Sequence, residues 1–140
     1  MKKFNFRLEK TLKIRLWTEN EAKVELGRMI GELSVIEESI KENTLQRNST
    51  AELRFSYGNL SNSDIYENYI LRLNHEREGL LKKKREAEEK FEQARKLWVE
   101  AKAELKSMED LKERRFTHYR KEALTEEEKQ IEDLWRQRQD

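Results

Sequence analysis

The sequence predicts an all-α fold: an antiparallel two-helix coiled-coil hairpin whose second helix is longer than the first. The first observation behind this prediction is composition, because 42% of the 140 residues are charged, 35% are hydrophobic and none is proline. That leaves too little apolar material for a layered core and almost nothing that breaks a helix. The second observation is a heptad repeat, with apolar residues at alternating steps of four and three. An apolar seam of this length needs a second helix to cover it.

The longest heptad repeat runs from Tyr66 to Tyr119 without a stutter. Twelve of its sixteen seam positions are apolar, and the other four are basic. Trp98 lies among small seam residues and is interpreted as a large side chain that packs where its neighbours leave room. We expect a helix over about residues 62–137. Its predicted core positions are Leu80, Phe91, Trp98, Leu105 and Met108.

A second repeat with the same spacing begins at Leu8 and supplies the helix that the long repeat needs. Eight of its ten seam positions as far as Ile40 are apolar, and the seam is weak at Arg15 and Glu19. We expect this first helix over about residues 6–52. Its predicted core positions are Leu26, Met29, Leu33, Ile36 and Ile40.

A polar segment separates the two repeats. Residues 43–63 are dense in Asn, Ser and Gly, which favour turns. We expect a loop over about residues 53–61, with the chain reversing near Gly58. Ser61 and Asp64 have the spacing of a capping box for the second helix.

The two expected helices differ in length. A short loop makes them antiparallel, and a reversal near residues 55–58 places Leu8 opposite roughly residue 104. Residues 1–140 then form a single hairpin domain, and the second helix has no internal partner beyond about residue 110. Large apolar residues exposed on such an overhang suggest a binding surface.

The charges are unevenly distributed, although the formal net charge is only +1. Residues 1–20 carry six Lys or Arg against two Glu, and residues 122–140 carry seven acids against three bases. These charges are read either as solvated helix faces or as two oppositely charged faces presented to a partner. The cluster Lys82-Lys83-Lys84-Arg85 is followed at once by acids and lacks interleaved aromatics, so we expect no nucleic-acid partner.

The residues give no sign of catalysis or of a cofactor. Cysteine is absent, His75 and His118 lie far apart, and there is no glycine-rich phosphate loop. A two-helix structure also lacks the pocket that shifts carboxylate pKa values for acid–base work. No apolar run could insert into a membrane, and the charged opening does not resemble a signal peptide. We therefore expect a cytoplasmic protein that is not an enzyme and binds no metal.

Two other architectures remain open from the residues alone. In a prefoldin-like chaperone subunit, two helices are joined through β-hairpins, and residues 52–58 alternate enough to allow one strand. In a structural homodimer, the long seam pairs between two chains.

Several segments resemble the flagellar export protein FliJ family. The opening FNFRLEKTLKIR at residues 4–15 is similar to the start of that family. So are YENYILRL at residues 66–73, WVEAK at residues 98–102 and EKQIEDL at residues 128–134. The resemblance covers nearly the whole chain.

The resemblance implies a non-enzymatic, stalk-like component of the flagellar type III export apparatus, which serves bacterial motility. It implies that the end with both termini enters the ring of the export ATPase FliI and promotes ring assembly. It also implies binding to the export gate protein FlhA and to chaperones of late substrates. The location it implies is cytoplasmic, at the inner face of the cell membrane and held there through these partners.

The resemblance and the position of residues along the hairpin give two sets of candidate contacts. The candidates for binding the ATPase are Phe4, Phe6, Arg7, Arg115, Phe116, Tyr119, Gln130 and Asp133. The candidates for binding the export gate, expected to be an exposed cluster, are Tyr66, Tyr69 and Leu73.

Overall fold

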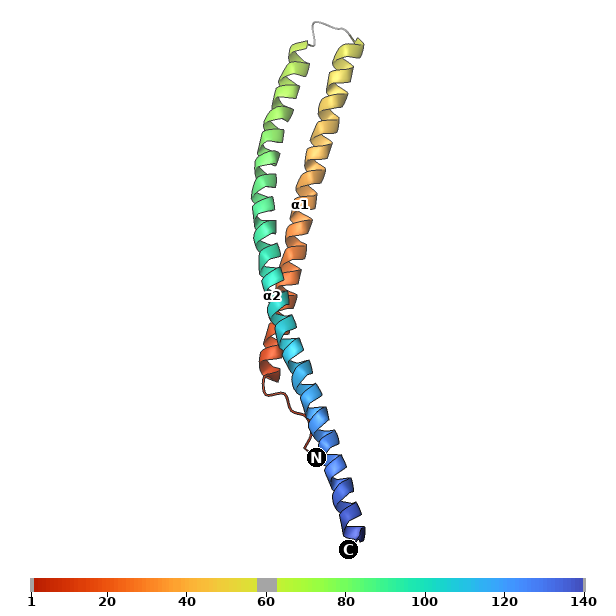
Figure 1. Cartoon of the computed structure of the whole chain (residues 1–140). Helices are drawn as coiled ribbons and strands as arrows, with labels where there is room; N and C mark the ends of the chain where they lie inside the picture. The colour runs from red at the N-terminus through yellow and green to blue at the C-terminus, as the bar shows by residue number, and fades with distance from the viewer. Residues whose placement is uncertain (1, 58–62, 140) are drawn as a thin grey trace. The chain divides into compact units, whose positions relative to one another are not determined.

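A computed structural model describes residues 2–57 and 63–139, which fold into two long helices (Figure 1). Helix α1 spans Glu9–Tyr57 and helix α2 spans Ser63–Gln139, at 49 and 77 residues. Each helix has an acid in its first turn and arginine in its last, charges that favour the helix dipole. The expected reversal at Gly58 and the expected cap at Ser61 lie outside the described residues.

Polar contacts between the helices show that they run antiparallel. Arg54 pairs with Glu67 at 2.8 Å between Nη2 and Oε1, and the Arg77 guanidinium donates to the Thr44 hydroxyl at 3.4 Å. Residues later in α1 therefore contact residues earlier in α2, as antiparallel helices do. The predicted all-α hairpin with a longer second helix is confirmed.

Contacts divide the chain into two compact units, each of which contains part of α1 and part of α2. The terminal unit comprises Met1–Glu21 and Val99–Asp140, and the inner unit comprises Ala22–Trp98. The expectation of a single domain over residues 1–140 stays a prediction.

The predicted seams are the sides on which the helices pack within each unit. Every predicted seam position of α2 except Arg115 is buried or half-buried, and so is every predicted seam position of α1 up to Ile40. All ten predicted core residues fall in this set. The seam alternates large side chains with alanines, which lets two helices approach closely. Its most buried apolar members are Met29, Leu73, Ala87, Ala94, Ala101 and Leu105.

Beyond Ile40, two polar residues of α1 are buried at seam spacing, while Arg47 between them is exposed. Asn43 and Thr50 are 4% and 7% exposed. The Asn43 amide Nδ2 donates to the Leu73 carbonyl at 3.0 Å, and the Thr50 hydroxyl donates to the Gln46 carbonyl at 2.8 Å. Among the described residues, Asn43 Oδ1 has no hydrogen-bond partner. Hydrogen bonds to backbone carbonyls thus let polar residues occupy core positions.

Two expectations for the first helix are wrong: that it ends at about residue 52, and that Leu8 lies opposite roughly residue 104. Helix α1 continues past residue 52 to Tyr57, and this also removes the strand that residues 52–57 could have formed in a prefoldin-like fold. In the terminal unit, the Lys112 ammonium pairs with Glu9 at 2.9 Å. Leu8 therefore lies beside residues about two helical turns beyond residue 104. The longer first helix accounts for the difference, because its extra residues shift the partners of α1 further along α2.

Candidate functional site

The lead-in to α1, residues 2–8, packs along α2 within the terminal unit (Figure 1). The Phe4 ring centroid lies 5.2 Å from that of Phe116 in an edge-to-face arrangement and 5.4 Å from that of Tyr119. The Tyr119 hydroxyl donates to the Lys2 carbonyl. The expectation that α2 has no internal partner beyond residue 110 is therefore wrong for Phe116 and Tyr119. The lead-in packs on them because aromatic residues bury large apolar areas when they pack together, although Phe116 stays 42% exposed.

Phe6 anchors the lead-in where α1 begins. Its side chain is only 5% exposed, and its carbonyl accepts a hydrogen bond from the Glu9 amide at 3.1 Å. The Arg115 guanidinium carbon lies 5.7 Å from the Phe6 ring centroid, a cation–π geometry. Phe6 is thus a packing residue, while Arg115 stays exposed above it. We refer to Phe4, Phe6, Phe116 and Tyr119 as the terminal aromatic cluster.

Basic side chains surround the terminal aromatic cluster. Lys2, Lys3 and Arg7 come from the lead-in and are exposed. Residues 114–121 of α2 carry three Arg and one Lys without an acid. The Arg120 guanidinium carbon lies 6.0 Å from the Phe116 ring centroid. Sequence reasoning noted the basic opening but missed that the fold places it beside a second acid-free basic stretch.

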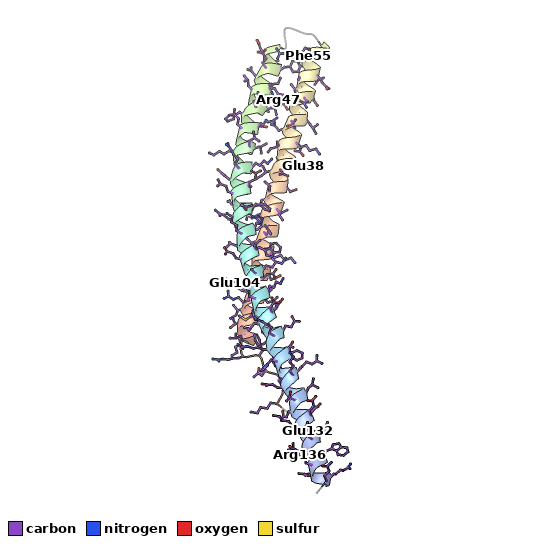
Figure 2. All side chains as sticks on the ribbon, in the orientation of Figure 1. Glu38, Arg47, Phe55, Glu104, Glu132 and Arg136 are labelled. Atoms are coloured by element: carbon purple, nitrogen blue, oxygen red, sulfur yellow. The ribbon has the colours of Figure 1, made fainter. Side chains whose placement is uncertain are left out.

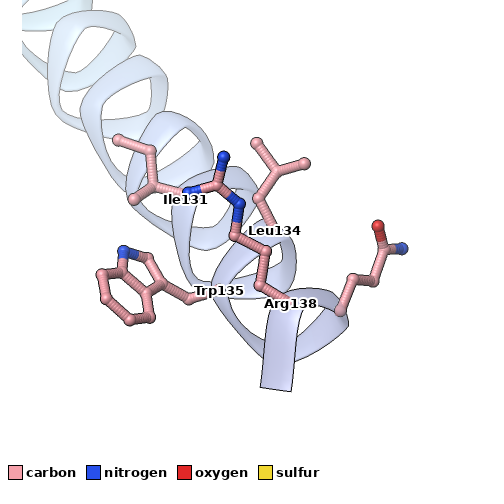
Figure 3. A pocket seen from close by; sticks show the side chains of 5 residues that line it. Ile131, Leu134, Trp135 and Arg138 are labelled. Carbon is pink, nitrogen blue, oxygen red and sulfur yellow. The ribbon is translucent and has the colours of Figure 1, made fainter. Parts of the chain in front are cut away.

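All residues of α2 from 124 to 139 are exposed, and we call them the terminal segment. Gln130 and Asp133, two candidates from the sequence, belong to it. Figure 2 shows its side chains, among them Glu132 and Arg136, projecting from the helix. Figure 3 shows Ile131, Leu134, Trp135 and Arg138 around a shallow hollow on its last turns. Its large apolar side chains are 57–64% exposed: Leu124, Ile131, Leu134 and Trp135.

The candidates for the export gate lie at the start of α2 in the inner unit and do not form one exposed cluster. Tyr69 is 36% exposed, with the Arg72 guanidinium carbon 5.6 Å from its ring centroid, and Tyr66 is half-buried. Leu73 is only 2% exposed, so its expected place in an exposed cluster is wrong. Leu73 faces α1 because its seam position meets Asn43 there.

Ion pairs within single helices perturb two carboxyl groups of the inner unit. A hydrogen bond from Arg28 lowers the pKa of Glu25, and one from Arg95 lowers the pKa of Glu92. Both pairs have three-residue spacing and a closest distance of 2.6 Å. Both are exposed, as expected of pairs that support a helix rather than perform acid–base chemistry.

The described residues contain neither a cluster of metal ligands nor a membrane-spanning helix. No group of three or more potential metal ligands occurs in residues 2–57 and 63–139, where His118 contacts a single carboxylate, that of Glu122, at 3.0 Å. Within the same ranges, neither helix has a stretch apolar enough to cross a membrane.

Comparison with known proteins gives one match. The sequence profile of the family described as Flagellar FliJ protein matches residues 4–138. No curated protein and no solved structure matches the chain. The matched region includes most of the lead-in, helix α1 and nearly all of helix α2. The chain therefore belongs to the flagellar FliJ protein family and is a component of the flagellar export apparatus.

Proposed function

We propose that the chain is a non-enzymatic, stalk-like component that inserts its terminal unit into the ring of the export ATPase and promotes ring assembly and activity. The observation that carries this proposal is the terminal segment, an α2 stretch with Leu124, Ile131, Leu134 and Trp135 all exposed. Large apolar side chains on a polar helix are typical of a surface that a partner covers. A helix needs no pocket for this role, because each contact biases a ring subunit by its differential affinity for two conformations.

The terminal unit suggests different roles for the ATPase-facing candidates. Phe4 packs on Tyr119 and Phe6 lies beneath Arg115, so these three residues hold the lead-in against α2. We propose that they position their exposed neighbours. The candidates for direct contact are Arg7, Arg115, Phe116, Gln130 and Asp133, together with the apolar residues of the terminal segment.

We propose that the start of α2 in the inner unit binds the export gate protein, with Tyr69 as the principal contact. Tyr69 presents an aromatic ring under a guanidinium, a combination common at interfaces. Tyr66 is half-buried beside it along the chain. Through these partners the protein would be held at the inner face of the membrane and would escort chaperones of late substrates.

The first experiment measures ATP hydrolysis and ring formation by the export ATPase with and without this protein. We expect stimulation by the full chain and none after deletion of residues 124–140, because the deletion removes only the terminal segment and the residue that follows it. Helix content measured by circular dichroism should fall only by the deleted part. ATP hydrolysis by this protein alone, or equal stimulation by the truncated chain, would contradict the proposal.

Point variants give a matched comparison. Ile131→Ala with Trp135→Ala should weaken ATPase binding at least tenfold, since each buried aromatic or aliphatic anchor contributes more than about 1 kcal/mol. Leu71→Ala with Leu97→Ala is the control, because Leu71 and Leu97 belong to the inner unit and are similarly exposed, at 65% and 61%. Equal losses for the two pairs would mean that binding does not use the terminal segment.

The gate contact is tested separately. Replacing Tyr66 and Tyr69 with Ala should weaken binding to the export gate protein in a pull-down or titration. It should leave stimulation of the ATPase unchanged, because the two tyrosines belong to the inner unit. Loss of both activities would indicate a folding defect rather than a gate contact.

A further inference from the structure

We infer that the terminal segment binds a second copy of this chain, forming an antiparallel homodimer centred on Leu124. This contact is distinct from the apolar seams, which the two helices of one chain cover for each other. It also differs from any contact with the export apparatus, since it needs only this protein. The inference rests on an exposed apolar stripe, on charged residues that form no ion pair within the described part of their own chain, and on the symmetric placement of these charges about Leu124.

The apolar stripe begins at Leu124 and follows one side of α2. Ile131 lies seven positions after Leu124, and Trp135 lies four positions further, so the three side chains fall on one helix face. They are 58%, 57% and 64% exposed. This face is not the seam that packs against α1, whose spacing continues through Arg115 and Tyr119. A helix of this chain therefore carries a second apolar stripe that its own hairpin leaves uncovered.

Four charged residues flank Leu124 and have no opposite charge within reach along their own helix. Arg120 and Lys121 precede it, and Glu127 and Glu128 follow it. The residues three and four positions from each of these four include no residue of opposite charge. Within the described part of the chain, none of the four forms an ion pair. Elsewhere on the helices, acids pair with nearby bases, as Glu25 does with Arg28.

These four charges are complementary to a second copy of themselves. The bases lie four and three positions before Leu124, and the acids lie three and four positions after it. An antiparallel copy with its Leu124 opposite this Leu124 therefore places Glu128 beside Arg120 and Glu127 beside Lys121. A two-fold axis generates each pair twice. A parallel copy would instead place like charges together, so the charges specify the antiparallel orientation.

The same alignment gives the end of the apolar stripe a place to pack. Trp135 falls opposite a hollow on α2 lined by Asp110, Glu113, Arg114 and Thr117. These four residues have the spacing of a hole that receives a knob in a coiled coil. Arg138 falls opposite Asp110, which adds a third complementary charge pair. The lead-in packs on Phe116 and Tyr119, which lie on a different side of α2.

The dimer contact is a single helix pair, and such small interfaces are weak. We expect dissociation in the micromolar range, so that dilution converts dimer to monomer, and weakening at high salt because exposed charge pairs are screened. The terminal segment is also the part proposed to enter the ATPase ring. If that proposal holds as well, dimer formation and ring insertion exclude each other. The experiments below use the chain alone, so their outcome does not depend on the proposed function.

The decisive experiment reverses either the two basic residues before Leu124 or the two acidic residues after it. The mass of each variant is measured by sedimentation equilibrium over about 1–300 μM, a range set by the expected affinity. R120E/K121E makes all four positions acidic, and E127R/E128R makes all four basic. Each variant alone should dissociate at least tenfold more readily than the natural chain. An equimolar mixture of the two should form a heterodimer. The quadruple variant R120E/K121E/E127R/E128R should regain the homodimer, because it places the acids before Leu124 and the bases after it and so keeps the charges complementary.

A control and a second readout separate this contact from general charge effects and from misfolding. K82E/R85E changes the net charge by the same amount on an exposed part of the inner unit and should leave dissociation unchanged. The chain has no cysteine, so Leu124→Cys should form an intermolecular disulfide with its own copy under mild oxidation. Lys129→Cys, on the opposite side of the helix, should not. A chain that stays monomeric throughout this range, or a mixture without heterodimer, would overturn the inference.

Discussion

Leu73 and Tyr69 lie one helical turn apart on α2, yet one is 2% exposed and the other 36%. Leu73 occupies a seam position, and its carbonyl accepts the buried Asn43 amide. Tyr69 lies beside the seam and carries Arg72 over its ring. In a two-helix structure, a small difference in position around the helix thus decides whether a side chain is buried between the helices or remains exposed to a partner.

Leu73→Ala is expected to lower the free energy of unfolding by about 2–5 kcal/mol, because it removes buried methyl groups and leaves a cavity. Urea unfolding followed by circular dichroism measures this change. Tyr69→Ala is the neighbouring control and should change it by less than about 0.5 kcal/mol. Equal effects of the two substitutions would show that Leu73 is not the core residue described here.

Asn43→Leu is expected to raise the free energy of unfolding by about 1 kcal/mol. The substitution removes the buried Oδ1 that has no partner and adds apolar contacts in the seam. The same measurement on Asn48→Leu, an exposed position on the same helix, should show little change. A less stable Asn43→Leu variant would mean that the hydrogen bond to the Leu73 carbonyl outweighs the unpaired oxygen.

At the scale of elements, the lead-in acts as a short third segment that packs on α2. Phe4 meets Phe116 and Tyr119, and Phe6 packs beneath Arg115. The lead-in has no helix of its own, and its contacts with α2 are mainly ring contacts. Its attachment therefore depends on a few aromatic side chains.

Phe4→Ala is expected to release the lead-in and to increase amide hydrogen exchange at residues 9–12 and 112–121 at least severalfold. Each lost aromatic pair removes about 0.5–1.5 kcal/mol of stabilisation beyond area burial. Total helix content should hardly change, because both helices retain their seams. Phe55→Ala provides the control, since Phe55 is 89% exposed. Unchanged exchange in the Phe4 variant would contradict the packing described for the lead-in.

At the scale of the whole molecule, electrostatic interactions are an important part of stability. The chain carries 29 acidic residues and 30 Lys or Arg, and few apolar residues are buried. Hydrogen bonds from arginine lower the pKa of Glu25 and of Glu92 in the folded state. A lowered pKa contributes stability that is present above the ordinary value of 4.5 and is lost as pH falls through the lowered one. The melting temperature should therefore decrease as the solution is acidified below that value.

Thermal melts at neutral and acidic pH test this expectation. E25Q/E92Q should melt below the natural chain at pH 7, and the two should converge in acid, where the carboxylates of the natural chain are protonated. Glu42→Gln with Glu52→Gln is the control, because both acids are exposed and form no ion pair within the described residues, and it should leave the difference between neutral and acidic melting unchanged. A difference between the natural chain and E25Q/E92Q that persists in acid would show that these pairs do not carry the pH dependence.

Local pattern predicted the helices, the seams and most of the core. Apolar residues at alternating spacings of four and three lie on one side of a helix. This follows from the geometry of the α-helix, which depends only on residues close together in the sequence. The candidate surfaces were predicted less well. Leu73, which the sequence places in an exposed cluster, is buried against Asn43. No composition rule shows that one amide can donate to a backbone carbonyl across the helix pair.

The sequence by itself determined that this chain makes two long helices with apolar seams, and that the second helix is longer. Tertiary structure alone decided that the lead-in packs on Phe116 and Tyr119 and that Asn43 and Leu73 meet in the core. Helix periodicity depends on residues a few positions apart, whereas these pairings depend on where a polar loop reverses the chain. A shift of a few residues in that reversal moves every partner along the opposite helix.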